Sequence, residues 1–323
     1  MAGHAAAARP NRLDELYGQL PAWLLDDAKR LQRHERFHAA VTLYAERVLK
    51  NFRKLPFLAR IMSGEARYLL CTALIAYHYT RNPLLPDTYA TVSRLQHFAT
   101  RFQIASPNRV VALLALMQFA GAVQTSRSQT DRRVKLVDFS EAAIAHGDKM
   151  ALGTLLPLRL LSPHDYEQAW NNIPGFRGRY YSECLRLYSD ARFVALLTEI
   201  DMLSTQDAAG ELKFKLWLGL ANHATDAPPI LAFPYGQIAR EFGVSRAHVR
   251  RIFEKCQEKN LLILHQPGGL GVEFLPAFSE ALLNFVSLEI ALMMRAADFA
   301  MTETATPGSM AWLHNDDGAI IKR

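Results

Sequence analysis

The chain has 323 residues, half of them apolar, and its 37 lysines and arginines outnumber 31 acidic residues to give a net charge of +6. This length predicts about two domains around a large core. The three isolated cysteines, Cys71, Cys184 and Cys256, argue against a disulfide framework and fit a reducing compartment. A pI near 9.2 is compatible with nucleic acid as a partner but also with other partners.

The sequence also predicts a chain that does not enter a membrane. Its best apolar run, residues 68–77, is too short to span a bilayer, and the first 13 residues lack the apolar core of a signal peptide. We therefore expect a flexible N-terminal tail and a cytoplasmic location.

Apolar periodicity predicts helices through the first part of the chain. They are expected over residues 13–30, with Pro21 at a start or an interruption, over 31–55 and over 64–80. Pro56 is expected to end the second helix, because proline has no backbone N–H to donate.

A short metal-binding pattern falls inside the second of these helices. His34, Glu35 and His38 match H-E-x-x-H, which on a helix places two imidazoles on one face for zinc, with a carboxylate as general base. Charged Arg36 and the short stretch before the motif disagree with a metallopeptidase. Zinc metallopeptidase is therefore a distant third interpretation, and we expect no catalysis, no metal and no cofactor.

Residues 91–139 predict a helix, a turn, a second helix and a hairpin. Pro107 suits the first position of the second helix, where only Asn108 and Arg109 are good base readers. The rest of this helix is apolar nearly all round, so it either reads DNA weakly or forms an interface. The hairpin carries cations suited to phosphate or the minor groove, namely Arg127, Arg132, Arg133 and Lys135.

The middle of the chain predicts a helical join followed by a turn at 174–178 and a helix over about 180–203. The join is rich in aromatic residues that could line a small-molecule pocket or belong to the core. The candidates are Trp170, Tyr180, Tyr181 and Tyr188. A small-molecule effector of unknown identity therefore stays open.

Residues 233–276 predict a short helix, a tight turn at Gly243, a second helix capped by Ser245, and a hairpin. The second helix runs to about Lys259, and Asn260 after it tolerates a left-handed conformation. Apolar residues at helical spacing form one stripe expected to be buried: Val249, Ile252, Phe253 and Cys256.

This order of elements resembles the winged helix-turn-helix of bacterial transcriptional regulators. The stretch IAREFGVSRAHVRRIFEKCQEKNLLI looks like the recognition segment of MarR-like and GntR-like regulators and of the CRP C-terminal domain. Those regulators often have glycine where Asn260 stands. The resemblance covers roughly a seventh of the chain and implies a DNA-binding module.

The resemblance implies that the start of the second helix meets base edges in the major groove. Arginine there can pair bidentately with guanine O6 and N7, and a small Ala247 allows close approach. Lys255 and Lys259 are placed to meet phosphate. The expected DNA-binding residues of this segment are Ser245, Arg246, Ala247, His248, Arg250, Arg251 and Lys255.

The two helix-and-hairpin stretches match one another at a fixed spacing, with one residue inserted near Ala105. From there the match predicts an ungapped register through both hairpins to the shared Phe-Ser-Glu-Ala at 139–142 and 278–281. We interpret it as an internal duplication. The matched pairs are Ala99/Ala239, Phe102/Phe242, Ser106/Ser245, Val110/Val249, Gln118/Gln257 and Leu136/Leu275.

The sequence therefore predicts a mainly α fold with small β-hairpin wings, in which two winged helix-turn-helix units form a pseudo-dimer. The resemblance to MarR-like regulators implies that the long helix over 278–299 forms an interface between the copies or between chains, so a homodimer stays open. The expected segments are a tail and helix (1–35), the first unit (36–146), a connecting helical segment (147–179), the second unit (180–301) and a tail (302–323).

The expected function is sequence-specific binding of double-stranded DNA by a bacterial transcriptional regulator that is not an enzyme. Its second recognition helix would enter the major groove, and its first, basic wing would contact the backbone. The alternative is a tandem winged-helix scaffold that binds proteins instead of DNA.

Overall fold

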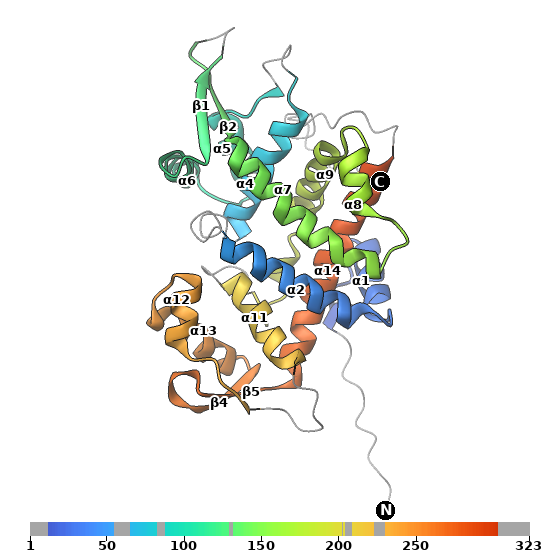
Figure 1. Ribbon diagram of the computed structural model, residues 1–323, viewed down its shortest axis with the longest axis vertical. Coiled ribbons are helices and arrows are strands. Elements are labelled where there is room, and N and C mark those ends of the chain that lie inside the picture. The colour runs from blue at the N-terminus through green and yellow to red at the C-terminus, as the bar shows by residue number, and fades with distance from the viewer. Residues whose placement is uncertain are drawn as a thin grey trace, which may run out of the picture.

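Helices make up most of the chain, and two small antiparallel sheets lie at opposite ends of the molecule (Figure 1). The computed structural model describes residues 12–54, 65–82, 88–128, 132–201, 203, 209–222 and 230–302. A mainly α fold with two small sheets is therefore confirmed. The tails expected before residue 12 and after residue 302 lie outside the described residues.

The first half begins with a 3-10 turn, η1 (Arg12–Leu16), and ends with another, η3 (Leu156–Leu160). Between them lie α1 (Ala22–Gln32), α2 (Phe37–Lys54), α4 (Glu65–Thr80), α5 (Val92–Arg101), α6 (Pro107–Phe119), β1 (Val123–Arg127), β2 (Lys135–Phe139) and α7 (Glu141–Leu155). Strands β1 and β2 pair as an antiparallel hairpin.

The second half follows the same order. It contains α8 (Tyr166–Asn172), α9 (Phe176–Ala191), η4 (Phe193–Leu196), α11 (Ala209–Ala221), β3 (Ile230–Leu231), α12 (Tyr235–Phe242), α13 (Arg246–Glu258), β4 (Leu262–Gln266), η5 (Pro267–Gly269), β5 (Gly271–Phe274) and α14 (Pro276–Met301). Its sheet has the order β3-β5-β4, so the hairpin β4–β5 gains a short third strand.

The turn between the two helices has the same geometry in both halves. The residue at its centre has a positive φ, 52° at Gln103 and 64° at Gly243. Glycine adopts this conformation without a steric penalty, and Gln103 shows that the first half accepts it in a residue with a side chain. One residue later the backbone N–H returns to the preceding helix, as Ile104 N does to Ala99 O at 2.8 Å.

A serine caps the second helix of each pair. The hydroxyl of Ser106 accepts from the N–H of Arg109, and that of Ser245 accepts from the N–H of His248 at 3.1 Å. Each serine therefore satisfies one backbone donor that the first helical turn leaves unpaired. The predicted cap at Ser245 and the predicted turn residue Gly243 are confirmed.

We predict that Ser245→Ala lowers the free energy of unfolding by about 1 kcal/mol, because it removes the acceptor for the His248 N–H. Urea unfolding measures this change. Ser93→Ala, an exposed position within α5, is the matched control and should change stability by less than about 0.5 kcal/mol. Equal effects of the two substitutions would contradict a capping role.

The hairpins correct the predicted register of the duplication. Val123 pairs with Phe139 across the first hairpin, and Leu262 pairs with Phe274 across the second, so the first hairpin is four residues longer. Phe139 therefore corresponds to Phe274 and not to Phe278. The shared Phe-Ser-Glu-Ala is a coincidence of sequence, because its second copy lies one turn inside α14.

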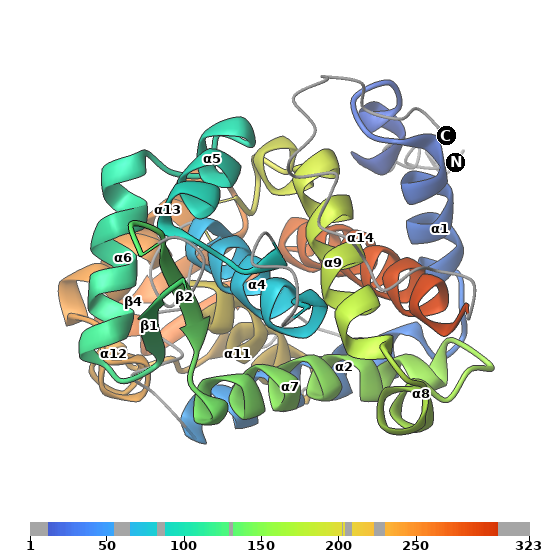
Figure 2. The same ribbon diagram turned by 90° about the horizontal axis from the view of Figure 1, so that it is seen from above.

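Helices cross between the two halves. α1 packs on α14 and α2 on α11, whereas α8 packs on α7 and α9 on α4 (Figure 2). The ring of Phe52 in α2 meets that of Phe242 at 5.5 Å, and Arg192 after α9 donates to the carbonyl of Phe102 at 2.8 Å. The first contact joins α2 of the first half to the end of α12 in the second, and the other joins the end of α9 in the second half to the end of α5 in the first. Each half therefore completes the core of the other.

This exchange shifts the expected segment boundaries. The predicted connecting segment, 147–179, begins inside α7 and ends inside α9, so it is not a separate piece. α8 and α9 open the second half as α1 and α2 open the first. The predicted helix over 180–203 is also wrong at its end, because Arg192 takes a φ of 42° and α9 stops at Ala191.

More than half of the long helix α14 is buried, and Leu282, Phe285, Ile290, Leu292 and Met293 all lie in the core. Its contacts with α1 and α9 make it an interface within the chain. By length and composition it is the one described helix that could cross a membrane, a candidate that the sequence had not identified. Its most apolar window is 67% buried inside the fold, as a core helix would be.

Candidate nucleic-acid interface

The α13 helix divides cleanly into a buried and an exposed side. Val249, Ile252, Phe253 and Cys256 are each at most 1% exposed, which confirms the predicted stripe. The expected DNA-binding positions on the other side are exposed, apart from His248. They are Ser245, Arg246, Ala247, Arg250, Arg251 and Lys255. The first two turns of α13 therefore present three guanidinium groups outward, with the small Ala247 between them.

His248 is half-buried beside these cations. Burial lowers the pKa of its imidazole below the usual 6.5, and the positive charges of Arg251 and Lys255 lower that pKa further. A lowered pKa keeps the ring neutral at pH 7. His248 is therefore suited to exchange hydrogen bonds and contributes no positive charge to this surface.

Arg240, at the end of α12, adds a cation that the sequence had not identified. A Cβ placed on Gly236 would lie 3.8 Å from Nη1 of Arg240 and 3.7 Å from Nε of Arg246, so both guanidinium groups pass over this glycine. The available signal was the i, i+4 spacing of Gly236 and Arg240 on one face of a helix. On the other flank Arg250 Nε lies 3.5 Å from Glu254, an exposed pair that holds the arginine only weakly.

Lys259 does not belong to this surface. Its ammonium group lies 3.3 Å from Asp201 Oδ1 and also donates to the carbonyl of Thr198. The predicted phosphate contact is therefore corrected, because Lys259 ties the end of α13 to the segment after η4.

The first hairpin gathers the cations expected on it. Arg127 and Lys135 face one another across the pair, and Arg127 Nη1 donates to the carbonyl of Arg132 at 2.8 Å. Arg132, Arg133 and Lys135 are exposed, whereas residues 129–131 lie outside the described residues. Four positive side chains therefore lie within residues 127–135 of the hairpin. The described positions of its two strands before Asp138 hold no acidic residue.

The α6 helix has a different outer side. Asn108 and Arg109 are exposed at its start, as predicted. Val110, Leu113, Leu114 and Met117 pack inward, whereas Val111 is 46%, Leu116 42% and Phe119 89% exposed. The apolar character all round the helix therefore reflects one buried face and one apolar face that meets solvent within the described structure.

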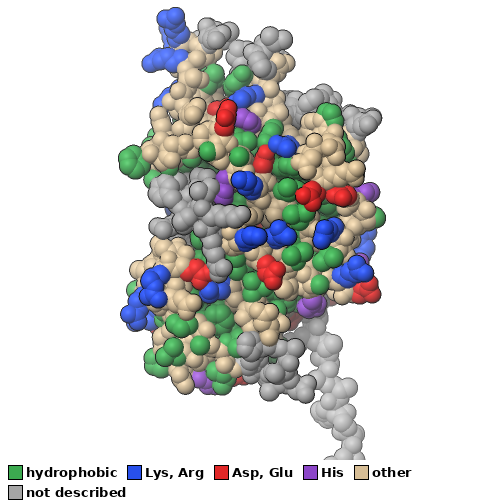
Figure 3. Space-filling view, in the orientation of Figure 1, with side chains coloured by type: hydrophobic (Ala, Val, Ile, Leu, Met, Phe, Trp, Pro, Cys, Tyr) green, Lys and Arg blue, Asp and Glu red, His purple; other side chains and the backbone are tan. Residues whose placement is uncertain are grey.

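α6 and α13 lie along the same side of the molecule, on the left in two perpendicular views (Figures 1 and 2). In the space-filling view, Lys and Arg side chains gather at the tip of the β1–β2 hairpin and on the outer side of the α12–α13 segment (Figure 3). The two basic regions occupy opposite ends of this side.

The H-E-x-x-H pattern does not lie on one helix. The chain leaves α1 after Gln32 and enters α2 at Phe37, so His34 and Glu35 sit in the intervening turn. His34 Nδ1 accepts from the N–H of Arg36, and His38 packs on Trp217 with ring centroids 6.1 Å apart. The predicted continuous helix is therefore wrong at 33–36, and the helical backbone that would place both imidazoles on one face is absent there.

The aromatic residues proposed for a pocket divide into two groups. Tyr180, Tyr181 and Tyr188 border an internal cavity. Trp170 lies in the core instead, edge-on to Phe176 and to both adjacent tyrosines. All three cysteines are buried and free, and burial raises the pKa of each thiol to about 12, so they persist as thiols at neutral pH.

Comparison of the chain with models of known protein families, with curated proteins and with solved structures gave no match.

Proposed function

We propose that this chain is a sequence-specific double-stranded DNA-binding protein that acts as a cytoplasmic bacterial transcriptional regulator. In this proposal α5, α6, β1 and β2 form one winged helix-turn-helix unit, and α12, α13, β4 and β5 form the other. The observation that carries it is the outer side of α13. Behind a left-handed turn and a serine cap, this helix presents Arg246, Arg250 and Arg251 to solvent while its apolar stripe is buried.

The second unit reads bases in this proposal. The N-terminal turns of a recognition helix approach base edges, where arginine pairs with guanine O6 and N7. Arg246 and Arg240 flank the helix start, where they can contact the phosphates beside the groove. The neutral hairpin β4–β5 carries glycines at 268, 269 and 271, and contributes little charge.

The first unit acts chiefly through its wing. Arg127, Arg132, Arg133 and Lys135 supply four charges for phosphate or a narrow minor groove, whereas α6 offers only Asn108 and Arg109 to bases. The two units form a covalent pseudo-dimer whose halves use different elements. A pair of different readers on one side of the molecule favours an asymmetric operator.

Selection from a pool of randomised duplexes tests the function. The expected result is an enriched, asymmetric motif, and an affinity for it that falls steeply as salt rises, because bound phosphates release counterions. No enrichment together with a flat salt response would remove DNA binding.

We predict that replacing the four hairpin cations by glutamine reduces the slope of log affinity against log salt by about 3–4, since each neutralised phosphate contributes about 0.9. Affinity should fall by a similar factor on selected and unrelated duplexes. Titrations between about 50 and 200 mM salt measure the slope. A quadruple variant of exposed arginines away from this side is the control, with an unchanged slope expected: Arg30, Arg33, Arg36 and Arg159.

The apolar outer side of α6 favours the second candidate, a tandem winged-helix scaffold for proteins. Phe119, at 89% exposed, has the highest exposed fraction of the large apolar side chains on the described surface. Phe119→Lys separates the candidates. It should leave DNA selection intact under the proposed function and abolish partner capture under the alternative.

A further inference from the structure

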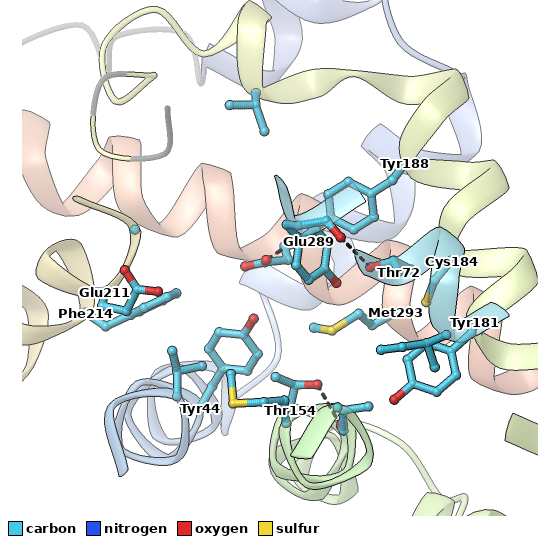
Figure 4. A pocket seen from close by; sticks show the side chains of 18 of the residues that line it. Tyr44, Thr72, Thr154, Tyr181, Cys184, Tyr188, Glu211, Phe214, Glu289 and Met293 are labelled. Atoms are coloured by element: carbon cyan, nitrogen blue, oxygen red, sulfur yellow. Dashed lines mark hydrogen bonds between the residues drawn. The ribbon is translucent and has the colours of Figure 1, made fainter. Parts of the chain in front are cut away.

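A cavity of about 200 Å³ lies in the middle of the fold, between α2, α4 and α7 of the first half and α9, α11 and α14 of the second (Figure 4). Two edge-to-face aromatic pairs form much of its wall. Tyr44 and Phe214 meet at 5.3 Å, and Tyr68 and Tyr188 meet at 5.9 Å. Each pair joins one residue from each half, so the cavity exists only where the halves meet.

Equivalent positions of the two halves face one another across this space. The correspondence follows from the shared element order and the corrected hairpin register. The pairs that line the cavity are Tyr44/Cys184, Val48/Tyr188, Met150/Phe285 and Thr154/Glu289. Every pair differs in chemistry, and the last one places a carboxylate opposite a hydroxyl. The lining therefore combines charged, polar and apolar side chains, and it is not the same on the two sides.

Its charged groups all come from the second half. Glu289 Oε1 accepts from the Tyr188 hydroxyl at 3.0 Å, and Glu289 Oε2 is buried without a hydrogen-bond partner among the described residues. Glu211 Oε2 is likewise buried without a hydrogen-bond partner among the described residues. Lys213 is 4% exposed, with Nζ 3.4 Å from the ring centroid of Phe285. Among the side chains that line the cavity, two carboxylates therefore outnumber one ammonium group, and the guanidinium group of Arg67 in α4 acts on Glu211 from outside the lining.

Burial is the largest cause of the pKa shift of each titratable group described next. Burial lowers the pKa of Lys213 to about 8, although both carboxylates act in the opposite direction. Burial also raises the pKa of Glu211, and burial with the nearby Glu289 raises that of Tyr44. A positive charge beside Glu211 and Glu289 stabilises their ionised form, whereas it opposes the charged form of Lys213.

We infer that the cavity binds a small organic monocation. Its ammonium group lies between Glu289 and Glu211 and donates to their unpartnered oxygens, and its apolar body extends toward Val48, Ile75 and Met150. Aromatic faces beside carboxylates are the surroundings in which an organic cation is best stabilised. A cavity of about 150 Å³ holds benzene, so this one suits a molecule of roughly eight non-hydrogen atoms.

The position of the cavity connects a bound ligand, through the helices around it, with the surface that we propose for DNA binding. α4 and α11 both border it, and each leads into one helix-turn-helix segment. A ligand that changes how these helices pack shifts the spacing of α6 and α13. This consequence rests on the proposed function, whereas the binding itself does not.

Calorimetric titration of the DNA-free protein tests the site directly. The probes are benzylammonium and 2-phenylethylammonium chloride, with the neutral 2-phenylethanol and the anion phenylacetate as matched bodies. We expect saturable binding of an ammonium probe, binding of the alcohol that is roughly tenfold weaker or less, and none of the anion. Equal binding of amine and alcohol overturns the inference, as does failure of both ammonium probes.

Two isosteric variants locate the charge. Glu289→Gln and Glu211→Gln should each weaken the ammonium probe by about tenfold or more and leave 2-phenylethanol unchanged. Glu46→Gln, an exposed position on α2, is the control and should bind as the parent does. Thermal melts of every variant without ligand show that it is folded. A change in melting temperature with unaltered probe binding would make these carboxylates structural and overturn the inference.

DNA binding is measured separately with the selected duplex. If the ammonium probe binds but duplex affinity stays constant, the site stands and its coupling to DNA fails. If no duplex is selected, the proposed function fails and the calorimetric result still decides the site.

Discussion

Replacing Arg250 and Arg251 together by alanine is expected to weaken binding to a selected duplex by about 2–6 kcal/mol, since each bidentate arginine–guanine contact contributes about 1–3 kcal/mol. Both side chains are exposed on the outer side of α13, and within the described part of the chain the ion pair found for them is the weak one from Arg250 to Glu254. Stability should therefore change by less than about 0.5 kcal/mol, which separates lost recognition from lost folding.

Fluorescence anisotropy with the selected duplex and with single-base variants of it measures this effect. Base discrimination should disappear at the positions that the two arginines read, while affinity for unrelated duplexes falls much less. The matched control is Arg30→Ala with Arg33→Ala, two exposed arginines at the end of α1. A uniform loss on every duplex would assign both side chains to phosphate and not to bases.

Features that depend on a few adjacent residues were predictable from the sequence. The turn at Gly243, the cap at Ser245, the start of α6 at Pro107 and the left-handed Asn260 all follow from local backbone chemistry. The buried stripe of α13 follows from helical spacing. Each of these depends on interactions within about one helical turn, which sequence patterns record well.

Features that depend on partners far along the chain were not predictable in the same way. The register of the duplication failed at the hairpin, because pairing between β1 and β2 decides which residues correspond, and the shared Phe-Ser-Glu-Ala concealed four extra residues. The exchange of α1 and α2 with α8 and α9 has no local signal. The apolar pattern of an amphipathic helix predicts that one face is buried, but it does not predict which helix covers that face.

Only some of the residues that line the cavity could be predicted from the sequence, for a related reason. The aromatic composition of the chain points to the tyrosines, whereas it gives no indication of Glu211, Lys213 or Glu289. A signal existed, because Glu289 interrupts a long apolar run in α14 and Lys213 stands in the apolar stretch of α11. A charge within a helix that is otherwise buried on most sides must meet a partner or a ligand.

The exchanged packing makes Phe52 the most sensitive test of how the halves depend on one another. Its side chain is 1% exposed, and its ring lies edge-on to Phe242 at the end of α12. Removing a buried aromatic ring leaves a cavity that neighbouring helices fill only partly. Phe52→Ala should therefore lower the free energy of unfolding by about 3–5 kcal/mol.

The same substitution at Phe119 is the matched control. Phe119 is 89% exposed at the end of α6, so Phe119→Ala should change stability by less than about 0.5 kcal/mol. Phe52 belongs to the first half and Phe242 to the second, so loss of this contact should destabilise both halves together. Urea unfolding followed by far-ultraviolet circular dichroism and by tryptophan fluorescence should then give coincident transitions. Two separated transitions, with the half that contains α13 unaffected, would show that the halves fold independently despite their exchanged helices.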